Sequence, residues 1–240
     1  MGRNRREQRG EDRDGEGSAE DVHHKGDTVA TEEVAPARRF AYLPVGMSVR
    51  AAAAELTRAR LIDAAIARFA ADGVGASFDA VAADVGVTKG ALYHHFGSKE
   101  GLVEAVYKEA VRRHAERVMA VSEHGDGRRR LLALIDESAR LYGSRTPFYR
   151  LLISLHLAAG TSRPELADIA RRVQRRQREY MVELVRTGQR DGSVDARLDA
   201  EAVGVTVNAA LEGFLVNQLE PPSAQRRWVA SFRTLMEDLL

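Results

Sequence analysis

The stretch between residues 77 and 100, SFDAVAADVGVTKGALYHHFGSKE, constrains the fold of this chain more than any other. Ser77 is suited to cap a helix, because its hydroxyl can accept a hydrogen bond from an unpaired amide of the first turn. Apolar residues then recur at helical spacing until Gly86, where only glycine takes a left-handed conformation without penalty. Thr88 is suited to cap a second helix. The stretch therefore predicts two short helices joined by a tight turn, the helix-turn-helix motif.

The second of these helices has two unlike faces. Leu92 and Phe96, four residues apart, are predicted to face the core and to meet the apolar stripe of a preceding helix. The opposite face carries small, basic and aromatic residues, namely Thr88, Lys89, Gly90, Ala91, Tyr93 and His94. Such an exposed face is typical of a helix that reads the major groove of DNA.

The motif and its flanks also match a known pattern. The matching features are Phe69 and Gly73, Ser77, Val81-Ala82, Gly86-Val87-Thr88, Leu92-Tyr93-His94-His95-Phe96 and Ser98-Lys99-Glu100-Gly101-Leu102. With them, residues 55 to 107 closely resemble the DNA-binding domain of tetracycline-repressor-type (TetR-like) bacterial regulators. The rest of the chain matches that family only in its helical layout. The resemblance implies a transcriptional regulator that works as a homodimer on a DNA operator and responds to a small molecule.

Carried over position by position, the resemblance also implies the DNA contacts. The expected set is Ser77, Thr88, Lys89, Gly90, Ala91, Tyr93, His94 and Lys99. Hydroxyls can donate to phosphates, and Lys89 can reach phosphate or guanine O6 and N7. Lys99 is expected to hold phosphate at the start of the next helix. For any single residue a solvated helix face is the alternative, and His95 is assigned a packing role.

The net charge of the helix-turn-helix segment and its flanks does not by itself indicate a nucleic-acid partner. The whole chain of 240 residues has a net charge of +1. Residues 51–110 hold six Lys and Arg against eight Asp and Glu, a balance of −2. A basic footprint is the usual sign of a DNA-binding domain. We therefore expect weak non-specific binding, with specificity resting on the local placement of Lys89 and Lys99 at helix N-termini.

Composition excludes several other classes of protein. The chain has no cysteine, so disulfides and cysteine-ligated zinc are excluded. Neither a signal peptide nor a membrane span is found, and we expect a bacterial cytoplasmic protein without membrane contact. No glycine-rich phosphate loop, nucleophile motif or metal-spaced cluster is present, so we expect no cofactor, no metal and no enzymatic activity. A helical adaptor without DNA binding is the alternative function.

The N-terminal 50 residues are predicted to be a disordered tail. They hold nine Lys and Arg against ten Asp and Glu, without apolar periodicity before Phe40. A solvated tail is the favoured interpretation. An arm that reaches into a minor groove, and a true start at Met47, are the alternatives.

Everything after the motif is predicted to be helical. The expected fold is all-α, with a three-helix DNA-binding domain at 51–110, a connecting helix, and a helical ligand-binding and dimerisation domain at 111–240. We expect a helix from 162 to 188, begun by a capping box in Ser162-Arg163-Pro164-Glu165.

Two groups of residues are assigned to the C-terminal domain. Candidate residues for a largely apolar ligand cavity are His114, Tyr142, Tyr149, His156, Tyr180, Asn208 and Glu212, with satisfied core side chains as the alternative. Candidate residues for the dimer interface are Val207, Leu211, Phe214, Leu215, Trp228, Phe232 and Met236. They form two wide apolar stripes that would build a four-helix bundle with a partner. The alternative is that both stripes close the core of a monomer.

Overall fold

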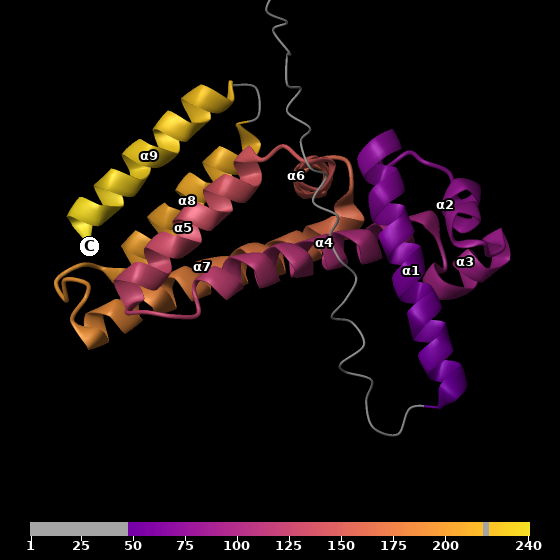
Figure 1. Cartoon of the computed structure of the whole chain (residues 1–240), viewed down its shortest axis with the longest axis horizontal. Coiled ribbons are helices and arrows are strands. Elements are labelled where there is room, and N and C mark those ends of the chain that lie inside the picture. The colour runs from indigo at the N-terminus through magenta and orange to yellow at the C-terminus, as the bar shows by residue number, and fades with distance from the viewer. Residues whose placement is uncertain (1–47, 218–220) are drawn as a thin grey trace, which may run out of the picture. The chain divides into compact units, whose positions relative to one another are not determined.

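The computed structural model describes residues 48–217 and 221–240, and it confirms the expected all-α fold (Figure 1). The helices within these ranges are α1 (Val49–Asp72), α2 (Phe78–Val85), α3 (Lys89–Phe96), α4 (Lys99–Val121), α5 (Gly127–Gly143), α6 (Pro147–Ala159), a 3-10 turn η2 (Pro164–Leu166), α7 (Ala167–Asp191), α8 (Ala200–Val216) and α9 (Pro222–Leu239). None of them is long and apolar enough to cross a membrane.

The first helix begins before the expected position. Ser48 caps α1, since its Oγ accepts a hydrogen bond from the amide of Ala51 at 3.2 Å, and the helix starts at Val49. A domain boundary at residue 51 therefore falls inside α1. The expected tail up to residue 47, with Met47 itself, lies outside the described residues.

Helices α1 to α3 form one packed group. α1 packs against α2, α4 and α6, and Figure 1 shows α2 and α3 beside it. Leu92 of α3 is completely buried, as predicted, in a core with Leu61 and Phe69. Phe96 is only partly buried, and the guanidinium of Arg58 lies 5.3 Å from its ring centroid. The inward face of α3 is thus narrower than the sequence indicated.

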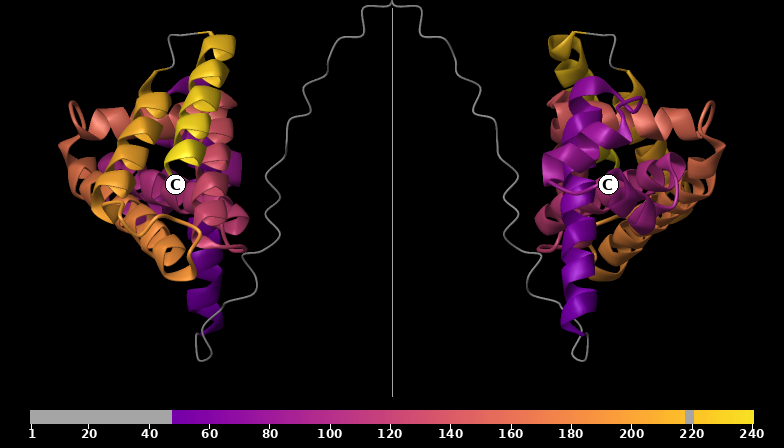
Figure 2. Two further views of the ribbon diagram at one scale, coloured as in Figure 1. Left: turned by 90° about the vertical axis from the view of Figure 1, so that its left-hand side faces the viewer. Right: turned by 90° about the vertical axis from the view of Figure 1, so that its right-hand side faces the viewer.

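A long helix, α4, connects this group to the remaining helices. It packs against α1 and α3 in one part and against α5 and α6 in another. Beyond it, α7 packs on α5 and α8, and α5 also carries α9 (Figure 2). One ion pair joins α4 to α1, between Arg113 and Asp63. A displacement of α4 therefore acts directly on the helix that supports α2 and α3.

Two expectations about α7 are wrong. Ser162-Arg163-Pro164-Glu165 is not a capping box, because no side chain caps η2 and α7 begins only at Ala167. Gly188 does not end α7, which continues to Asp191. A Cβ on Gly127 would lie 2.0 Å from the amide nitrogen of Gly188, so two glycines allow α5 and α7 to touch. That contact explains Gly127, whereas Gly188 is explained by Val194, whose Cγ2 would lie 2.4 Å from a Cβ at position 188.

Candidate nucleic-acid interface and ligand cavity

The turn between α2 and α3 is built as its sequence predicts. Gly86 ends α2 in a left-handed conformation with φ 73° and ψ 32°. The next amide, of Val87, donates to the carbonyl of Ala82 at 3.0 Å. Thr88 then caps α3, because its Oγ1 accepts from the amide of Ala91 at 3.2 Å. These local bonds fix the direction in which α3 leaves the turn.

The outer face of α3 is open to solvent. Thr88, Lys89, Gly90, Tyr93 and His94 are exposed, and Ala91 is half-buried. A Cβ on Gly90 would meet only Thr88 Oγ1, at 3.8 Å. Packing therefore does not require glycine at position 90, but its absence of a side chain leaves the helix backbone accessible to a partner.

The aromatic ring on this face is held in place from below. The ring of Tyr93 lies 5.0 Å from that of buried Phe78 in α2, with 59° between their planes. Tyr93 remains 45% exposed. Its hydroxyl is therefore available to donate, while its ring packs on α2.

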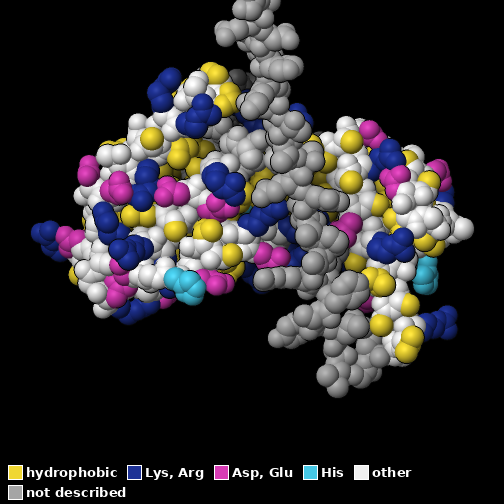
Figure 3. All heavy atoms as spheres, viewed as in Figure 1, with side chains coloured by type: hydrophobic (Ala, Val, Ile, Leu, Met, Phe, Trp, Pro, Cys, Tyr) yellow, Lys and Arg dark blue, Asp and Glu magenta, His cyan; other side chains and the backbone are white. Residues whose placement is uncertain are grey.

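The basic residue of the same face already has an acidic partner. Lys89 Nζ donates to Asp79 Oδ2 at 2.9 Å, and this hydrogen bond raises the pKa of Lys89. Arg68 of α1 is paired in turn with Asp84 of α2. Figure 3 shows basic and acidic side chains interspersed on the face in view. A phosphate would thus compete with Asp79 for Lys89.

The two remaining members of the expected set border α3. Ser77 is exposed and caps α2, accepting from the amide of Ala80 at 3.1 Å. Lys99, at the start of α4, donates its Nζ to the carbonyl of Gly75 at 2.8 Å. The side chain of Lys99 therefore joins α4 to the loop before α2, and a phosphate would have to share its three donors.

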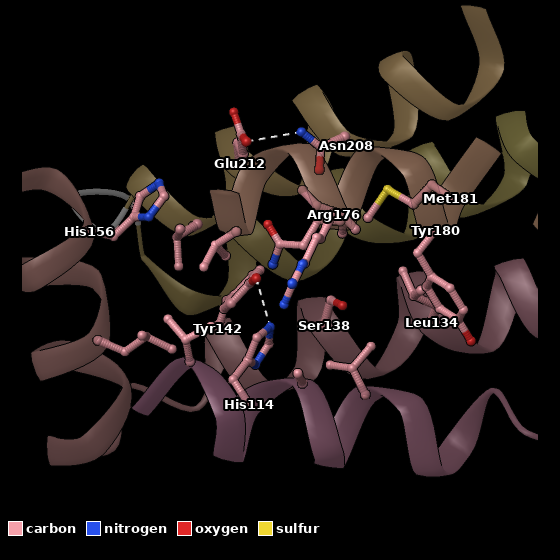
Figure 4. Close-up of a pocket in the computed structure, with 18 of the residues that line it drawn as sticks. His114, Leu134, Ser138, Tyr142, His156, Arg176, Tyr180, Met181, Asn208 and Glu212 are labelled. Carbon is pink, nitrogen blue, oxygen red and sulfur yellow. Dashed lines mark hydrogen bonds between the residues drawn. The ribbon is translucent and has the colours of Figure 1, made fainter. Parts of the chain in front are cut away.

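A second feature is a cavity of about 390 Å³ enclosed by α4, α5, α6, α7 and α8 (Figure 4). This volume lies in the usual range for small-molecule sites, ~300–1,000 Å³. Its wall is mainly apolar, with side chains that include Val118, Leu134, Leu152, Val173, Met181, Leu211 and Leu215. The cavity is therefore suited to a ligand with an apolar body.

Three hydrogen-bonded pairs interrupt the apolar wall. Tyr142 Oη and His114 Nε2 are 3.0 Å apart, and so are Tyr107 Oη and His156 Nδ1. Asn208 Nδ2 donates to Glu212 Oε1 at 2.9 Å. Each pair joins two polar groups that would otherwise be costly to bury.

Burial also sets the protonation of the histidines and tyrosines. It lowers the pKa of His114 to about 4, with nearby Arg117 adding to the effect, and it lowers the pKa of His156. It raises the pKa of Tyr107 to about 12 and that of Tyr142 further. Near neutral pH these four groups are therefore uncharged. They offer hydrogen bonds to a ligand but no charge.

Six of the seven candidate cavity residues line this space. They are His114, Tyr142, His156, Tyr180, Asn208 and Glu212. Tyr149 does not, because its buried ring packs edge-on against His114 at 5.9 Å and Tyr142 at 6.4 Å. It supports the polar wall from behind.

Sequence reasoning missed several lining residues, among them Tyr107, Ser138, Arg176 and Gln177. Arg176 belongs to a group of arginines between residues 171 and 178, for which the sequence predicts a solvated helix face. Its side chain extends into the cavity in Figure 4. Val173 and Gln177, which lie three residues before and one residue after Arg176, also line the cavity. Their helical spacing is the only sequence signal for the position of Arg176.

The structure places most of the candidate dimer residues inside the protomer. Val207, Leu211, Leu215 and Met236 are at most 6% exposed. The rings of Phe214 and Phe232 contact each other at 5.8 Å between α8 and α9. Of the seven, only Trp228 remains exposed, at 38%. The buried members of these stripes pack within the protomer, where α8 lies against α5 and α7 and α9 lies against α5.

A different apolar face of α8 and α9 is exposed. The described residues include eleven exposed large apolar side chains, and five of them lie on these two helices: Val205, Val216, Trp228, Leu235 and Leu239. Small residues Ala209 and Gly213 lie on the same exposed side of α8. Clustering of this kind is typical of a surface that binds a partner, a membrane or a ligand. Figure 2 shows both helices facing the viewer on its left.

Within the described ranges, no group of three or more His, Cys, Asp or Glu side chains is arranged to hold a metal ion.

Comparison with known families gives two matches that lie in tandem. Residues 61–106 match the family described as bacterial regulatory proteins, tetR family. Residues 127–240 match the family described as BetI-type transcriptional repressor, C-terminal. The first match contains α2 and α3, and the second contains α5 to α9.

Individual proteins agree with these matches. Over 57 residues the chain is 51% identical to the HTH-type transcriptional regulator SrpR of Pseudomonas putida and 49% identical to the uncharacterised HTH-type transcriptional regulator TtgW of the same species. These 57 residues are 23% of this chain, and they span only 27% and 42% of the two relatives. A TetR transcriptional regulator from Chloroflexus aurantiacus superposes with a TM-score of 0.66 at 26% identity, over 78% of this chain and 96% of that one.

Proposed function

Because the chain belongs to the tetR family of bacterial transcriptional regulators, we propose that it is a repressor that binds an inverted-repeat operator and leaves it when a small molecule fills its cavity. The observation that carries the proposal is the outer face of α3. It presents a lysine, a supported tyrosine hydroxyl and an open glycine backbone on a helix fixed at both ends by caps. We place this activity in the bacterial cytoplasm, where chromosomal DNA lies.

The proposed DNA contacts divide by chemistry. Thr88 and Tyr93 donate to phosphates, and Ser77 and Lys99 do so from the flanks of α3. Lys89 and His94 reach base edges or phosphates, while Gly90 and Ala91 allow the backbone to approach thymine methyl groups. Because Lys89 is paired with Asp79, the affinity depends only weakly on salt concentration.

The test uses operators selected from random duplex DNA with the full-length chain. Lys89→Ala and Tyr93→Phe are expected to weaken operator binding without changing helical circular dichroism. If Lys89 reads a guanine, its loss costs about 1–3 kcal/mol and relaxes preference at one base pair. Asp79→Asn is the opposing variant, and it tightens binding because it frees Lys89.

Failure to select any sequence, with a folded protein, would favour the alternative of a helical adaptor. Equal binding by the parent and both weakened variants would remove α3 from the DNA contact. A regulator is favoured over an enzyme, since the matching family consists of regulators.

The inverted repeat follows from a proposed two-fold dimer. One recognition helix covers too few base pairs to be specific in a genome, so a second half-site is required. We assign the contact to the exposed apolar face of α8 and α9, and no longer to the buried stripes. Ala209 and Gly213 allow two copies of α8 to approach closely.

Helix α4 couples the cavity to the DNA-contacting group. His114, Ala115 and Val118 of α4 line the cavity. One residue away, Arg113 is paired with Asp63 of α1 and with Glu109 of its own helix. A ligand that displaces α4 therefore moves α1 and, through it, the spacing of the two recognition helices.

A further inference from the structure

The cavity has a mouth whose charge differs from that of its interior. A second hollow, lined by residues of α4 and α7, adjoins the cavity and shares with it Val111, His114, Ala115, Val173, Arg176 and Gln177. The remaining side chains of this mouth are Lys108, Arg112, Ile169 and Arg172. Four of its lining residues are thus cationic and none is acidic.

The four cations are not equivalent. Lys108 is paired with Glu104, and Arg112 is paired with Glu109 and Glu116, so α4 neutralises its own charges. Arg172 and Arg176 have no ion-pair partner among the described residues. They lie four residues apart on α7 and therefore one turn apart on the same side of the helix. Two uncompensated guanidinium groups thus border the mouth, and Arg176 also lines the interior.

The single acidic residue of the site lies elsewhere. Glu212 of α8 lines the interior of the cavity but not the mouth. In the interior it accepts a hydrogen bond from Asn208. An anion is therefore attracted at the α4–α7 mouth and repelled at the α8 end. This asymmetry gives a bound amphiphile one orientation, with its charged group at the mouth and its apolar body inside.

A neutral group at the mouth remains to be satisfied. His114 is 5% exposed and lines both spaces, and its Nδ1 has no hydrogen-bond partner among the described residues. When Tyr142 donates to Nε2, the proton of the ring is on Nδ1, which then donates. A buried donor without a partner is costly, and an oxygen of a ligand would satisfy it.

We propose that the effector is an amphipathic organic anion, whose carboxylate binds Arg176 and Arg172 at the mouth and whose apolar body fills the cavity between α4, α7 and α8. This inference rests on the proposed function only in taking the cavity as the effector site. A guanidinium binds a carboxylate through two parallel hydrogen bonds, which an ammonium ion or an alcohol cannot form with it.

The test compares three probes with the same ten-carbon body: decanoate, 1-decanol and decyltrimethylammonium. Isothermal titration calorimetry with the full-length chain is expected to show decanoate binding about ten- to a hundredfold more tightly than 1-decanol, the range of a charge-assisted hydrogen bond. The cation is expected to bind more weakly than the alcohol. Arg176→Gln is expected to reduce the preference for decanoate over 1-decanol.

Arg171→Gln is the matched control, because Arg171 lies on the same helix but is paired with Asp168 and does not line the cavity. It is expected to keep the full preference for decanoate. Ala115→Phe, which narrows the shared wall of mouth and cavity, is expected to weaken both decanoate and 1-decanol.

Two results would overturn the inference: equal binding of decanoate and 1-decanol by the parent chain, or an unchanged preference in Arg176→Gln. Calorimetry needs no DNA, so either result leaves operator binding by the same preparation unaffected. Loss of operator binding with retained decanoate preference would instead count against the proposed function alone.

Discussion

At the scale of single residues, the buried polar groups of the cavity wall carry the clearest physical signature. His114 is held neutral among aromatic rings, with Tyr142 stacked at 5.1 Å and Tyr149 edge-on at 5.9 Å. The free energy of unfolding therefore falls at any pH at which this imidazole is protonated in the unfolded chain but neutral in the folded one.

A pH dependence of stability follows from this. The pKa of His114 is about 4 in the folded chain and about 6.5 in the unfolded one, so stability is complete above about pH 6.5 and falls as the pH drops toward 4. Between pH 7.5 and 5.0 the loss is roughly 2 kcal/mol from this residue. Urea unfolding of His114→Gln at both values is expected to show a smaller loss than the parent. A smaller slope persists, because burial also lowers the pKa of His156.

His124, which is exposed, provides the control for this measurement. His124→Gln is expected to retain the full difference between the two pH values. An identical difference in His114→Gln and the parent would show that His114 is protonated inside the fold.

The inward side chains of α3 give a second residue-scale prediction. Leu92 is completely buried, whereas Phe96 is partly exposed beside Arg58. Leu92→Ala is expected to cost about 2–5 kcal/mol of unfolding free energy by leaving a cavity. Phe96→Ala is expected to cost less than about 3 kcal/mol, below the usual range for a buried phenylalanine, because solvent can fill part of the space. Chemical denaturation measures both losses of unfolding free energy. A larger loss for Phe96→Ala than for Leu92→Ala would contradict the burial described for these two side chains.

At the scale of elements, the junction between α3 and α4 depends on a glycine. Gly97 ends α3 with φ 73°, and Ser98 caps α4 by accepting from the amide of Gly101 at 3.0 Å. A Cβ on Gly101 would lie 2.2 Å from the carbonyl oxygen of Phe96. The two helices can therefore meet at this angle only if residue 101 has no side chain.

Two glycine substitutions separate packing from recognition. Gly101→Ala is expected to destabilise the chain by about 1–3 kcal/mol, because the clash is with backbone and not with a mobile side chain. Gly90→Ala adds a methyl group in open space near the start of α3, and it is expected to keep or raise stability by up to ~1 kcal/mol. Thermal unfolding distinguishes them.

Gly90→Ala is expected to weaken operator binding, although it keeps or raises stability. The added methyl group projects from the proposed DNA-contacting face, so affinity falls although the fold is intact. Full affinity in Gly90→Ala would argue against close approach of this part of α3 to DNA.

At the scale of the whole molecule, the exposed apolar face of α8 and α9 is the surface to which we assign the proposed dimer contact. Leu235 is 66% exposed and Leu239 is 47% exposed, on the same side of α9. Of the residues first expected at the interface, Val207, Leu211, Leu215 and Met236 are buried within the protomer, whereas Trp228 lies on the exposed face of α8 and α9. Both helices rest on α5, which fixes the orientation of the outer face.

A single charge in this face is expected to separate the protomers. Leu235→Glu places a carboxylate where two copies of α9 would bury it, so light scattering is expected to report a particle near the chain mass of 26.4 kDa in place of twice that mass. Leu157→Glu, on the exposed side of α6 at 46% exposure, is the control and is expected to remain dimeric. A parent chain that is monomeric at micromolar concentration would contradict both the dimer and the inverted-repeat operator.

The sequence by itself determined those features that depend on neighbours along the chain. The caps at Ser77 and Thr88, the left-handed Gly86 and the helical periodicity of the apolar residues are local features, and the structure shows each of them. The resemblance of the helix-turn-helix segment was equally local. Six of the seven candidate cavity residues were placed correctly, because polar side chains on apolar helical faces must meet partners inside the fold.

Only the tertiary structure decided which face of an apolar helix is covered. Val207 and Leu211 lie under α5 and α7, whereas Val205, two residues before Val207, faces solvent, and periodicity alone cannot tell an inner apolar stripe from an outer one. The sequence predicts a helix end at Gly188, whereas in the structure the backbone of Gly188 lies inside α7 and against Gly127. Arg176 lines the cavity together with residues of α4 that lie more than 50 positions away in the chain. Each of these depends on distant segments, whose packing is a property of the whole fold.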